Sequence, residues 1–314
     1  MVIDIHPEFG YEMACSMPWA YWLHKTGEPV KVITCKGMKP FYYFCDEVEE
    51  KYNHRSVNNS VNGVQNLPNS WIHHNADAVF GKDYSFLNEE QKIEVNGVLD
   101  YTEWTPPPLK EYYKDERFKQ GEKTIVVSNK ITMDHGQEPH GFFDIELLYD
   151  MFNYLTENGY TIIYKRPKMS EFPLDENEIK TINGRYTISA DVEGLGVIDD
   201  YQLIKHYDNI ILLDDIVNNS DYDYNEAQLR TFSNVDNFIS IAGGNSIFCS
   251  YFGGNQVTYV TTSKELRPGY YEGDSYVKKL GGANIHAVID PESEIIRRGY
   301  NDYVPLMKKI MEVF

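Results

Sequence analysis

Asp236-Asn-Phe-Ile-Ser-Ile-Ala-Gly-Gly-Asn-Ser-Ile-Phe-Cys-Ser-Tyr-Phe-Gly-Gly254 is the stretch of sequence from which the fold class of this chain can be inferred. Its apolar beginning predicts a buried strand, and apolar residues then recur at helical spacing over residues 247–252. Gly243 and Gly244 separate the two, where a backbone without side chains can approach a ligand closely. Asn245 or Ser246 can cap the helix, whose first free N–H groups point at the turn. The pattern predicts an anion site that fits a phosphate, although a plain strand-turn-helix would look the same.

Length and charge limit the kinds of ligand that such a site could take. The 314 residues exceed one usual core and predict two domains with a cleft between them. With 29 Lys and Arg against 48 Asp and Glu, the net charge is -19, which disfavours nucleic acid and anionic membranes as partners. The sequence shows no membrane-spanning run, signal peptide or zinc-type cysteine spacing, so we expect a cytoplasmic protein with a small ligand.

The first half of the chain begins with a strand, a helix and a second strand, predicted over residues 2–5, 11–25 and 30–35. This spacing predicts a right-handed parallel crossover, so the loop at residues 6–10 lies at the carboxyl edge of a sheet. The proline-rich residues 104–108 exclude a helix, and we place the domain crossing over residues 104–122.

The second half alternates between strands and helices, which predicts a doubly wound parallel sheet with helices on both faces. Before the stretch quoted first, strands are predicted over residues 124–128, 161–164, 186–189 and 209–213, and helices over residues 143–158, 201–206 and 225–233. After that stretch we predict a strand over residues 257–261 and a C-terminal helix over residues 302–314.

Several motifs of the second half occur in the order found in a known family. They are Ser128-Asn-Lys130, Gly159-Tyr-Thr-Ile-Ile-Tyr-Lys-Arg-Pro167 and Phe232-Ser-Asn-Val-Asp-Asn-Phe-Ile-Ser-Ile-Ala-Gly-Gly-Asn-Ser246. Residues 124–261 thereby resemble the nucleotide-sugar half of GT-B glycosyltransferases, and are similar to the fucosyltransferase-like and heptosyltransferase-like members. The general pattern is also similar to that of glycosyltransferases encoded by large algal viruses. The first half matches only in the loop Glu8-Phe-Gly-Tyr-Glu12.

The resemblance implies an α/β fold of two Rossmann-like domains that face a central cleft. Residues 1–110 would bind the acceptor, residues 111–300 the nucleotide sugar, and residues 301–314 would form a closing helix. The implied reaction moves a hexosyl or pentosyl group from a UDP- or GDP-linked donor to a carbohydrate acceptor, with inversion and without an obligatory metal or cofactor. The nucleotide-binding residues would be Asn129, Lys130, Arg166, Asp214, Gly243, Gly244, Asn245 and Ser246.

Two of these residues, Lys130 and Arg166, follow their strands directly, where a cation can stabilise the charge that develops on the departing diphosphate. An inverting transfer also needs a base within hydrogen-bond reach of the acceptor hydroxyl. The candidates are Glu8, Glu12, Asp134 and His135, with Glu138, His73, His74 and Asp77 as further possibilities.

Two other interpretations remain open at this stage. Asp221-Tyr-Asp223 has the form of the DxD motif with which GT-A glycosyltransferases hold a divalent metal, although it lies in a loop-like acidic segment. A non-catalytic carbohydrate or nucleotide binder would equally suit the 25 tyrosines and four tryptophans, which offer stacking surfaces.

Overall fold

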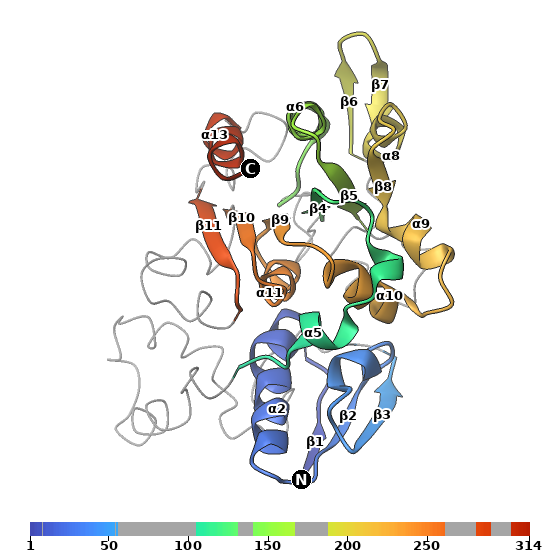
Figure 1. Cartoon of the computed structure of the whole chain (residues 1–314), viewed down its shortest axis with the longest axis vertical. Helices are drawn as coiled ribbons and strands as arrows, with labels where there is room; N and C mark the ends of the chain where they lie inside the picture. Colours follow the sequence, from blue (N-terminus) through green and yellow to red (C-terminus); the bar gives the residue numbers. More distant parts are fainter. Residues whose placement is uncertain are drawn as a thin grey trace.

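The computed structural model describes residues 1–7, 9–53, 55, 105–130, 141–166, 188–260, 281–289 and 303–314. These residues form a three-stranded sheet, a six-stranded sheet and a two-stranded hairpin. The three-stranded sheet lies at one end of the molecule, in blue in Figure 1, and the hairpin lies at the other. Within the described residues, no helix combines the length and the apolar character needed to cross a bilayer.

The N-terminal sheet has three parallel strands, β1 (Val2–Asp4), β2 (Lys31–Cys35) and β3 (Glu47–Tyr52), in that order. Helical segments connect β1 to β2, namely α1 (Phe9–Tyr11), the π-helical turn η1 (Glu12–Ser16) and α2 (Met17–Lys25). Gly27, at φ 85°, follows α2 in the left-handed region that ends many helices. The predicted strand-helix-strand crossover is confirmed. The charged and mostly exposed strand β3 was outside the prediction because it lacks an apolar pattern.

The large sheet has six parallel strands in the order β11-β10-β9-β4-β5-β8. They are β4 (Thr124–Ser128), β5 (Thr161–Lys165), β8 (Ile210–Leu212), β9 (Asn237–Ile241), β10 (Asn255–Val260) and β11 (Asn284–Ile289). From β4 the chain first adds β5 and β8 on one side, and then β9, β10 and β11 on the other. This is the order of a doubly wound sheet whose switch point lies between β4 and β9. The predicted doubly wound parallel sheet is confirmed.

Helices cover both faces of the large sheet. On the first face, here called the α6 face, lie α6 (Ile145–Glu157), α8 (Asp200–Ile204) and α13 (Val304–Val313). On the opposite face, the α11 face, lie α9 (Leu213–Asn218), α10 (Tyr224–Phe232) and α11 (Gly244–Ser250). Strand residues alternate between the two, since Val127 packs on the α6 face and Val126 on the α11 face.

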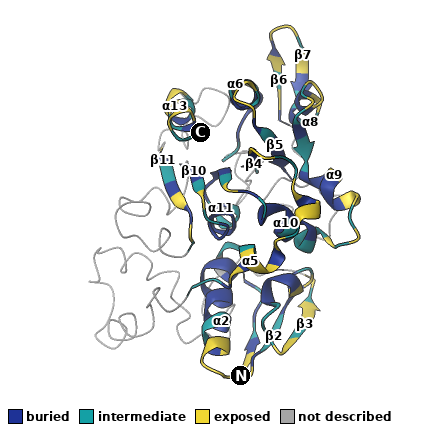
Figure 2. Cartoon of the chain, viewed as in Figure 1, coloured by how far each residue is buried: buried dark blue, intermediate teal, exposed yellow. Residues whose placement is uncertain are grey.

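The core of the α11 face continues into the N-terminal sheet (Figure 2). The Phe248 ring on α11 lies 6.1 Å from the Phe9 ring and 5.4 Å from the Phe41 ring, measured between centroids. The Tyr251 hydroxyl donates a 2.6 Å hydrogen bond to the carbonyl oxygen of Met13. Because one apolar cluster joins the two sheets, the division into domains at residue 110 stays a prediction.

Two segments differ from the prediction. Ser189, expected in a strand of the large sheet, belongs to β6 (Ser189–Val192), which pairs antiparallel with β7 (Gly196–Asp199) in a separate hairpin. This strand is mostly exposed, whereas a strand of the large sheet is covered on both faces. In the predicted crossing, residues 109–113 form the short helix α5 (Leu109–Tyr113), which packs on α10.

Candidate functional site

The site is built where β4 and β9 end side by side. Asn129 and Lys130 follow β4, and the residues 243–246 follow β9. The connections leave these two strands in opposite directions, which opens the crevice where doubly wound sheets bind their ligands. The fold thereby brings together two predicted segments that are more than a hundred residues apart in sequence.

Gly243 has a backbone conformation that requires glycine. Its φ of 125° and ψ of -165° lie in a region that residues with a side chain essentially do not adopt. A Cβ atom on Gly243 would lie 2.8 Å from Nζ of Lys130. The lysine ammonium group therefore lies beside the turn, and its role as the cation of an anion site stays a prediction.

Gly244 makes room for the N-terminal part of the chain. A Cβ atom on Gly244 would lie 2.7 Å from the nitrogen and 2.9 Å from the Cα of Gly10, and 3.1 Å from Cδ1 of Phe9. The first βα loop of the N-terminal sheet thus touches the turn directly. Of the two glycines, Gly243 remains the candidate for ligand contact, since Gly10 occupies the space at Gly244.

Lys165, the last residue of β5, is a cation that the sequence interpretation missed. It is only 4 % exposed, and its Nζ donates a 2.7 Å hydrogen bond to Oδ1 of Asn245. The ammonium group also lies 5.7 Å from the ring centre of Phe248 on α11. Burial lowers the pKa of Lys165 to about 8, against the opposing effects of nearby Cys249 and Asp214. Within the described residues it forms no ion pair.

Strand register places Lys165 in a row of polar side chains on the α11 face. Ser128 pairs with Lys165 on one side and with Ser240 on the other, and Ser240 pairs with Thr258. The hydroxyl oxygen of Ser128 is buried and has no hydrogen-bond partner among the described residues. The row therefore gives the floor of the site a polar character, and the hydrogen-bonding capacity of the Ser128 hydroxyl is unused among the described residues.

Ser246 belongs to this polar layer. Nε2 of Gln256 donates to its Oγ at 2.9 Å and to its carbonyl oxygen at 3.0 Å, and Ser246 is 1 % exposed. These contacts fix α11 on β10, so the structure places Ser246 behind the site. Asn245 lies in front of it, where its side chain meets Lys165.

Asn129 and Arg166, both predicted to bind the nucleotide, point to the α6 face. Nδ2 of Asn129 donates to the Tyr164 hydroxyl at 2.9 Å, and that hydroxyl donates to Oδ2 of Asp200 at 2.7 Å. Nη2 of Arg166 donates to Oδ1 of the same Asp200 at 2.6 Å. Because consecutive residues of a strand face opposite sides, Lys165 and not Arg166 reaches the α11 face. The structure thus gives Asn129 and Arg166 a supporting position.

Asp214 lies in the first turn of α9, at the carboxyl end of β8, and is 5 % exposed. Its carboxylate is close enough to raise the pKa of Lys165, in opposition to burial. Burial raises the pKa of Tyr224 on α10, and the Asp214 carboxylate raises it further. Asp214 therefore lies on the α11 face with Lys165, and its role in nucleotide binding stays a prediction.

Glu12, a predicted base, lies in the core of the N-terminal part, in the turn η1. It is fully buried, and its Oε1 accepts hydrogen bonds from Thr34 at 2.6 Å and from the Tyr42 hydroxyl at 2.9 Å. Its Oε2 pairs with Nη1 of Arg55 at 2.5 Å, and the same Nη1 donates to the carbonyl oxygen of Pro7. Glu12 thereby holds the first βα loop in the shape that meets Gly244.

The other predicted bases lie outside the described residues. These are Glu8, Asp134 and His135, together with the further possibilities Glu138, His73, His74 and Asp77. Their roles remain predictions.

The DxD sequence occupies a different part of the molecule. Asp223 caps α10, because its side chain accepts a 3.0 Å hydrogen bond from the backbone N–H of Glu226. Asp221 is exposed in the loop between α9 and α10. Both precede a helix rather than follow a strand, so neither lies at the carboxyl edge of the sheet.

The fold and this edge define an open, doubly wound α/β protein with a cationic, glycine-lined switch point. One solved structure that superposes on it is the glycosyl transferase family 9 protein of Veillonella parvula, with a TM-score of 0.50 and 9% identity over 99% of this chain and 95% of that chain. Another is the ADP-heptose lps heptosyltransferase II of E. coli, with a TM-score of 0.51 and 10% identity over 99% of this chain and 98% of that chain. No protein-family model and no curated protein matches the sequence. The resemblance to heptosyltransferase-like proteins of the GT-B type is confirmed as a likeness of fold.

Proposed function

We propose that this protein is a glycosyltransferase of the GT-B type that moves a hexosyl or pentosyl group from a nucleotide diphosphate sugar to a carbohydrate acceptor. The proposed donor is UDP- or GDP-linked, and the transfer is inverting and needs no metal. Three features support it: the likeness of fold, the glycine turn at the switch point, and the cations beside that turn. Among these features, the buried Lys165 gives the strongest support.

Lys165 is the observation that carries the proposal. A buried ammonium group that lacks an ion pair is costly, and such a group with a shifted pKa in a crevice is a candidate for ligand binding. Here the group lies at the carboxyl edge of the sheet and contacts Asn245 of the turn. A diphosphate bound between Lys165 and Lys130 would supply the missing negative charge, and the Ser128 hydroxyl could donate to it.

The proposed reaction breaks the bond between the anomeric carbon of the donor and its β-phosphate oxygen. As the acceptor hydroxyl oxygen attacks that carbon from the opposite side, the diphosphate leaves with the bonding electrons and gains negative charge. Lys165 is held in place by Asn245 before the reaction, which is the condition for efficient stabilisation of a developing charge, and Lys130 supplies a second cation beside the turn. The acceptor proton passes to the base, for which Glu8, Asp134 and His135 are our proposals.

The first experiment is a thermal-shift screen with UDP, GDP, ADP and CMP, each with and without Mn²⁺. A ligand that binds only the native state raises its stability in proportion to ln(1 + [L]/Kd). We expect a nucleoside diphosphate to stabilise the wild-type protein and to lose most of this effect in Lys165→Met. The matching nucleotide sugar is then incubated with glycan acceptors, and release of the nucleoside diphosphate is measured.

The outcomes separate this proposal from its alternatives. Stabilisation without turnover, over a broad acceptor panel, would favour a nucleotide binder without catalysis. Stabilisation that requires Mn²⁺ would favour a metal-dependent enzyme, and Asp221 and Asp223 would then be tested as ligands. If no nucleotide stabilises the protein, the proposal is wrong.

A further inference from the structure

Asn129, the residue that follows β4, has a fully buried side chain whose amide group is fully hydrogen-bonded. Its Oδ1 accepts from the backbone N–H groups of Lys130 and Phe143, each at 2.9 Å. Its Nδ2 donates to the carbonyl oxygen of Phe143 at 3.0 Å and to the Tyr164 hydroxyl at 2.9 Å. The side chain therefore ties the backbone of Lys130 to that of Phe143, the residue just before the N-cap of α6.

The neighbours of Asn129 on the α6 face fix the direction in which its amide group points. The Tyr164 hydroxyl donates its proton to Oδ2 of Asp200 at 2.7 Å, and Arg166 holds Asp200 in a buried ion pair. Because the single hydroxyl proton is used in this way, the Tyr164 oxygen can only accept, so it must face Nδ2 of Asn129. The acceptor Oδ1 is thereby turned towards the backbone N–H of Lys130.

The residue that Asn129 holds carries one of the two cations of the site. A Cβ atom on Gly243 would lie 2.8 Å from Nζ of Lys130. A lysine side chain has many conformations, so the direction in which its backbone leaves the strand limits where the ammonium group can reach. Supporting hydrogen bonds of this kind are what keep a binding group in its productive position. The amide of Asn129 is therefore placed to control the position of Lys130.

We infer that Asn129 is a positioning residue for Lys130 and fixes the ammonium group beside Gly243 when a diphosphate binds. The inference rests on the proposed function, since it takes the nucleoside diphosphate as the ligand. Asn129 acts on affinity through Lys130, because its own amide hydrogen bonds are all made within the protein. Its link to Lys165 is a 2.9 Å bond from its backbone N–H to that carbonyl oxygen, which a side-chain substitution keeps.

The test is a double-mutant cycle in the full chain. Calorimetry gives the Kd of UDP or GDP, whichever stabilises the wild type more, for the wild type, Asn129→Ala, Lys130→Met and the double variant. We expect Asn129→Ala to weaken binding at least about fivefold when Lys130 is present, and less than about twofold when it is replaced. A residue that only stabilises the fold would lower the affinity by the same factor in both backgrounds.

A second substitution covers the case in which the alanine variant does not fold. Asn129→Ser is measured in the same cycle, since its hydroxyl can still accept one hydrogen bond in place of the amide oxygen. The same dependence on Lys130 is expected of it. If neither variant folds, the role of Asn129 is structural and the inference is wrong.

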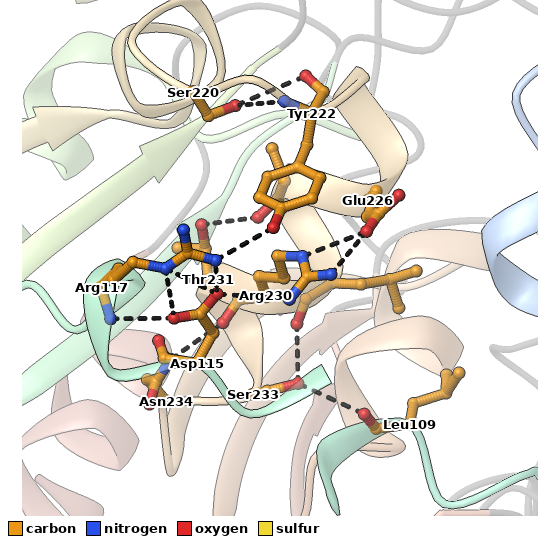
Figure 3. A network of polar contacts seen from close by, with 12 residues as sticks. Leu109, Asp115, Arg117, Ser220, Tyr222, Glu226, Arg230, Thr231, Ser233 and Asn234 are labelled. Atoms are coloured by element: carbon orange, nitrogen blue, oxygen red, sulfur yellow. Dashed lines mark hydrogen bonds and ion pairs between the residues drawn. The ribbon is translucent and has the colours of Figure 1, made fainter. Parts of the chain in front are cut away.

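The matched control is Asn234→Ala, in the polar network around Asp115 that Figure 3 shows. Nδ2 of Asn234 donates to the carbonyl oxygens of Asp115 at 2.8 Å and of Arg230 at 2.9 Å. Asn234 precedes β9, so it lies at the amino edge of the sheet, whereas Lys130 follows β4 at the carboxyl edge. This variant also loses hydrogen bonds from an asparagine to the backbone, yet its nucleotide affinity should stay within about twofold of the wild type.

Three results would overturn the inference although the wild type binds the nucleotide. They are an unchanged affinity in Asn129→Ala, an equal loss of affinity with and without Lys130, and a loss of the same size in Asn234→Ala. The last would show that destabilisation alone explains the effect. Failure of the proposed function looks different, because the wild type would then bind neither UDP nor GDP, and the inference would fall with it.

Discussion

Nζ of Lys165 donates a 2.7 Å hydrogen bond to Oδ1 of Asn245, and this contact joins the end of β5 to the first turn of α11. The amide oxygen is a neutral partner, so the positive charge of Lys165 is solvated by a dipole and by the faces of two phenylalanine rings. The charge is buried and is not cancelled by an ion pair with the described residues. Lys165 is therefore the first residue whose substitution should reveal a bound anion.

Replacement of Lys165 by Met should weaken binding of the preferred nucleoside diphosphate by about 10- to 100-fold, the range for a lost hydrogen bond to a charged group. The folded state should not be destabilised, because Met fills a similar volume without a buried charge. Calorimetry gives the affinity and thermal unfolding gives the stability. Lys205→Met, which removes an exposed lysine at the end of α8, is the matched control. Equal affinities for the Lys165 variant and the wild type would exclude Lys165 from the site.

Binding of the nucleoside diphosphate should depend on pH through Lys165. Burial lowers the pKa of this lysine from 10.5 to about 8, and a bound anion favours its charged form. Affinity should therefore be constant below about pH 8 and fall above it by at most about tenfold per pH unit. Calorimetric titrations with the nucleoside diphosphate, carried out from pH 6.5 to pH 9.5 and so within about two pH units of this pKa, measure the change in affinity.

The stability of the ligand-free protein should change in the opposite direction. Between about pH 8 and pH 10.5 the unfolded chain carries the proton on Lys165 and the folded chain does not. The contribution of Lys165 to the free energy of unfolding therefore rises with pH in this window. Comparison with Lys165→Met isolates the contribution, because the variant lacks this pH dependence. A wild-type curve parallel to that of the variant would show that the lysine pKa is not lowered.

The contact between Gly244 and Gly10 predicts that even the smallest side chain is harmful at position 244. Gly244→Ala should lower the free energy of unfolding by about 1–3 kcal/mol, because the added methyl group would meet the backbone of Gly10. The larger substitution Gly244→Val therefore cannot test ligand contact alone. Gly282→Ala is the control, since its methyl group would lie 3.7 Å from the nearest atom, an ordinary contact. Unfolding in urea distinguishes the two, and equal destabilisation would contradict the assignment.

Substitution of Glu12 tests whether this residue is the catalytic base or a structural support of the first βα loop. Glu12→Ala should destabilise the protein by about 3–5 kcal/mol because it removes one member of a buried ion pair, the carboxylate that pairs with Arg55. The milder Glu12→Gln should remain folded, and we expect its kcat to stay within about tenfold of the wild type. A loss of about two to four powers of ten with unchanged nucleotide affinity would instead identify Glu12 as the base.

Turnover should survive the removal of divalent ions. The proposal assigns charge stabilisation to Lys130 and Lys165, and both act without a metal. Activity is therefore assayed after dialysis against EDTA and again after addition of Mn²⁺. Complete loss of activity that Mn²⁺ restores would contradict the prediction. The same assay on Lys165→Met measures the contribution of the lysine separately from that of a metal ion.

The sequence by itself determined the secondary-structure alternation of the second half, and with it the parallel sheet. Long apolar strands such as residues 124–128 and the amphipathic helix after Asp144 carry local signals that tertiary contacts do not change. The sequence also indicated the turn at Gly243, where two glycines end an apolar run. In the structure Gly243 has a conformation that only glycine adopts readily. Exposed elements without such a pattern, among them β3 and the hairpin β6–β7, could not be predicted in this way.

The tertiary structure alone decided which polar residues meet at the site. Lys165 and Arg166 are adjacent in sequence and equally cationic, yet strand alternation sends them to opposite faces of the sheet, and only the packing of α11 and of the N-terminal part shows which face holds the site. Likewise, the charge of Glu12 gave no sign of Arg55, since their contact spans 43 residues. Strand order and long-range packing are properties of the whole chain, and a local pattern contains neither.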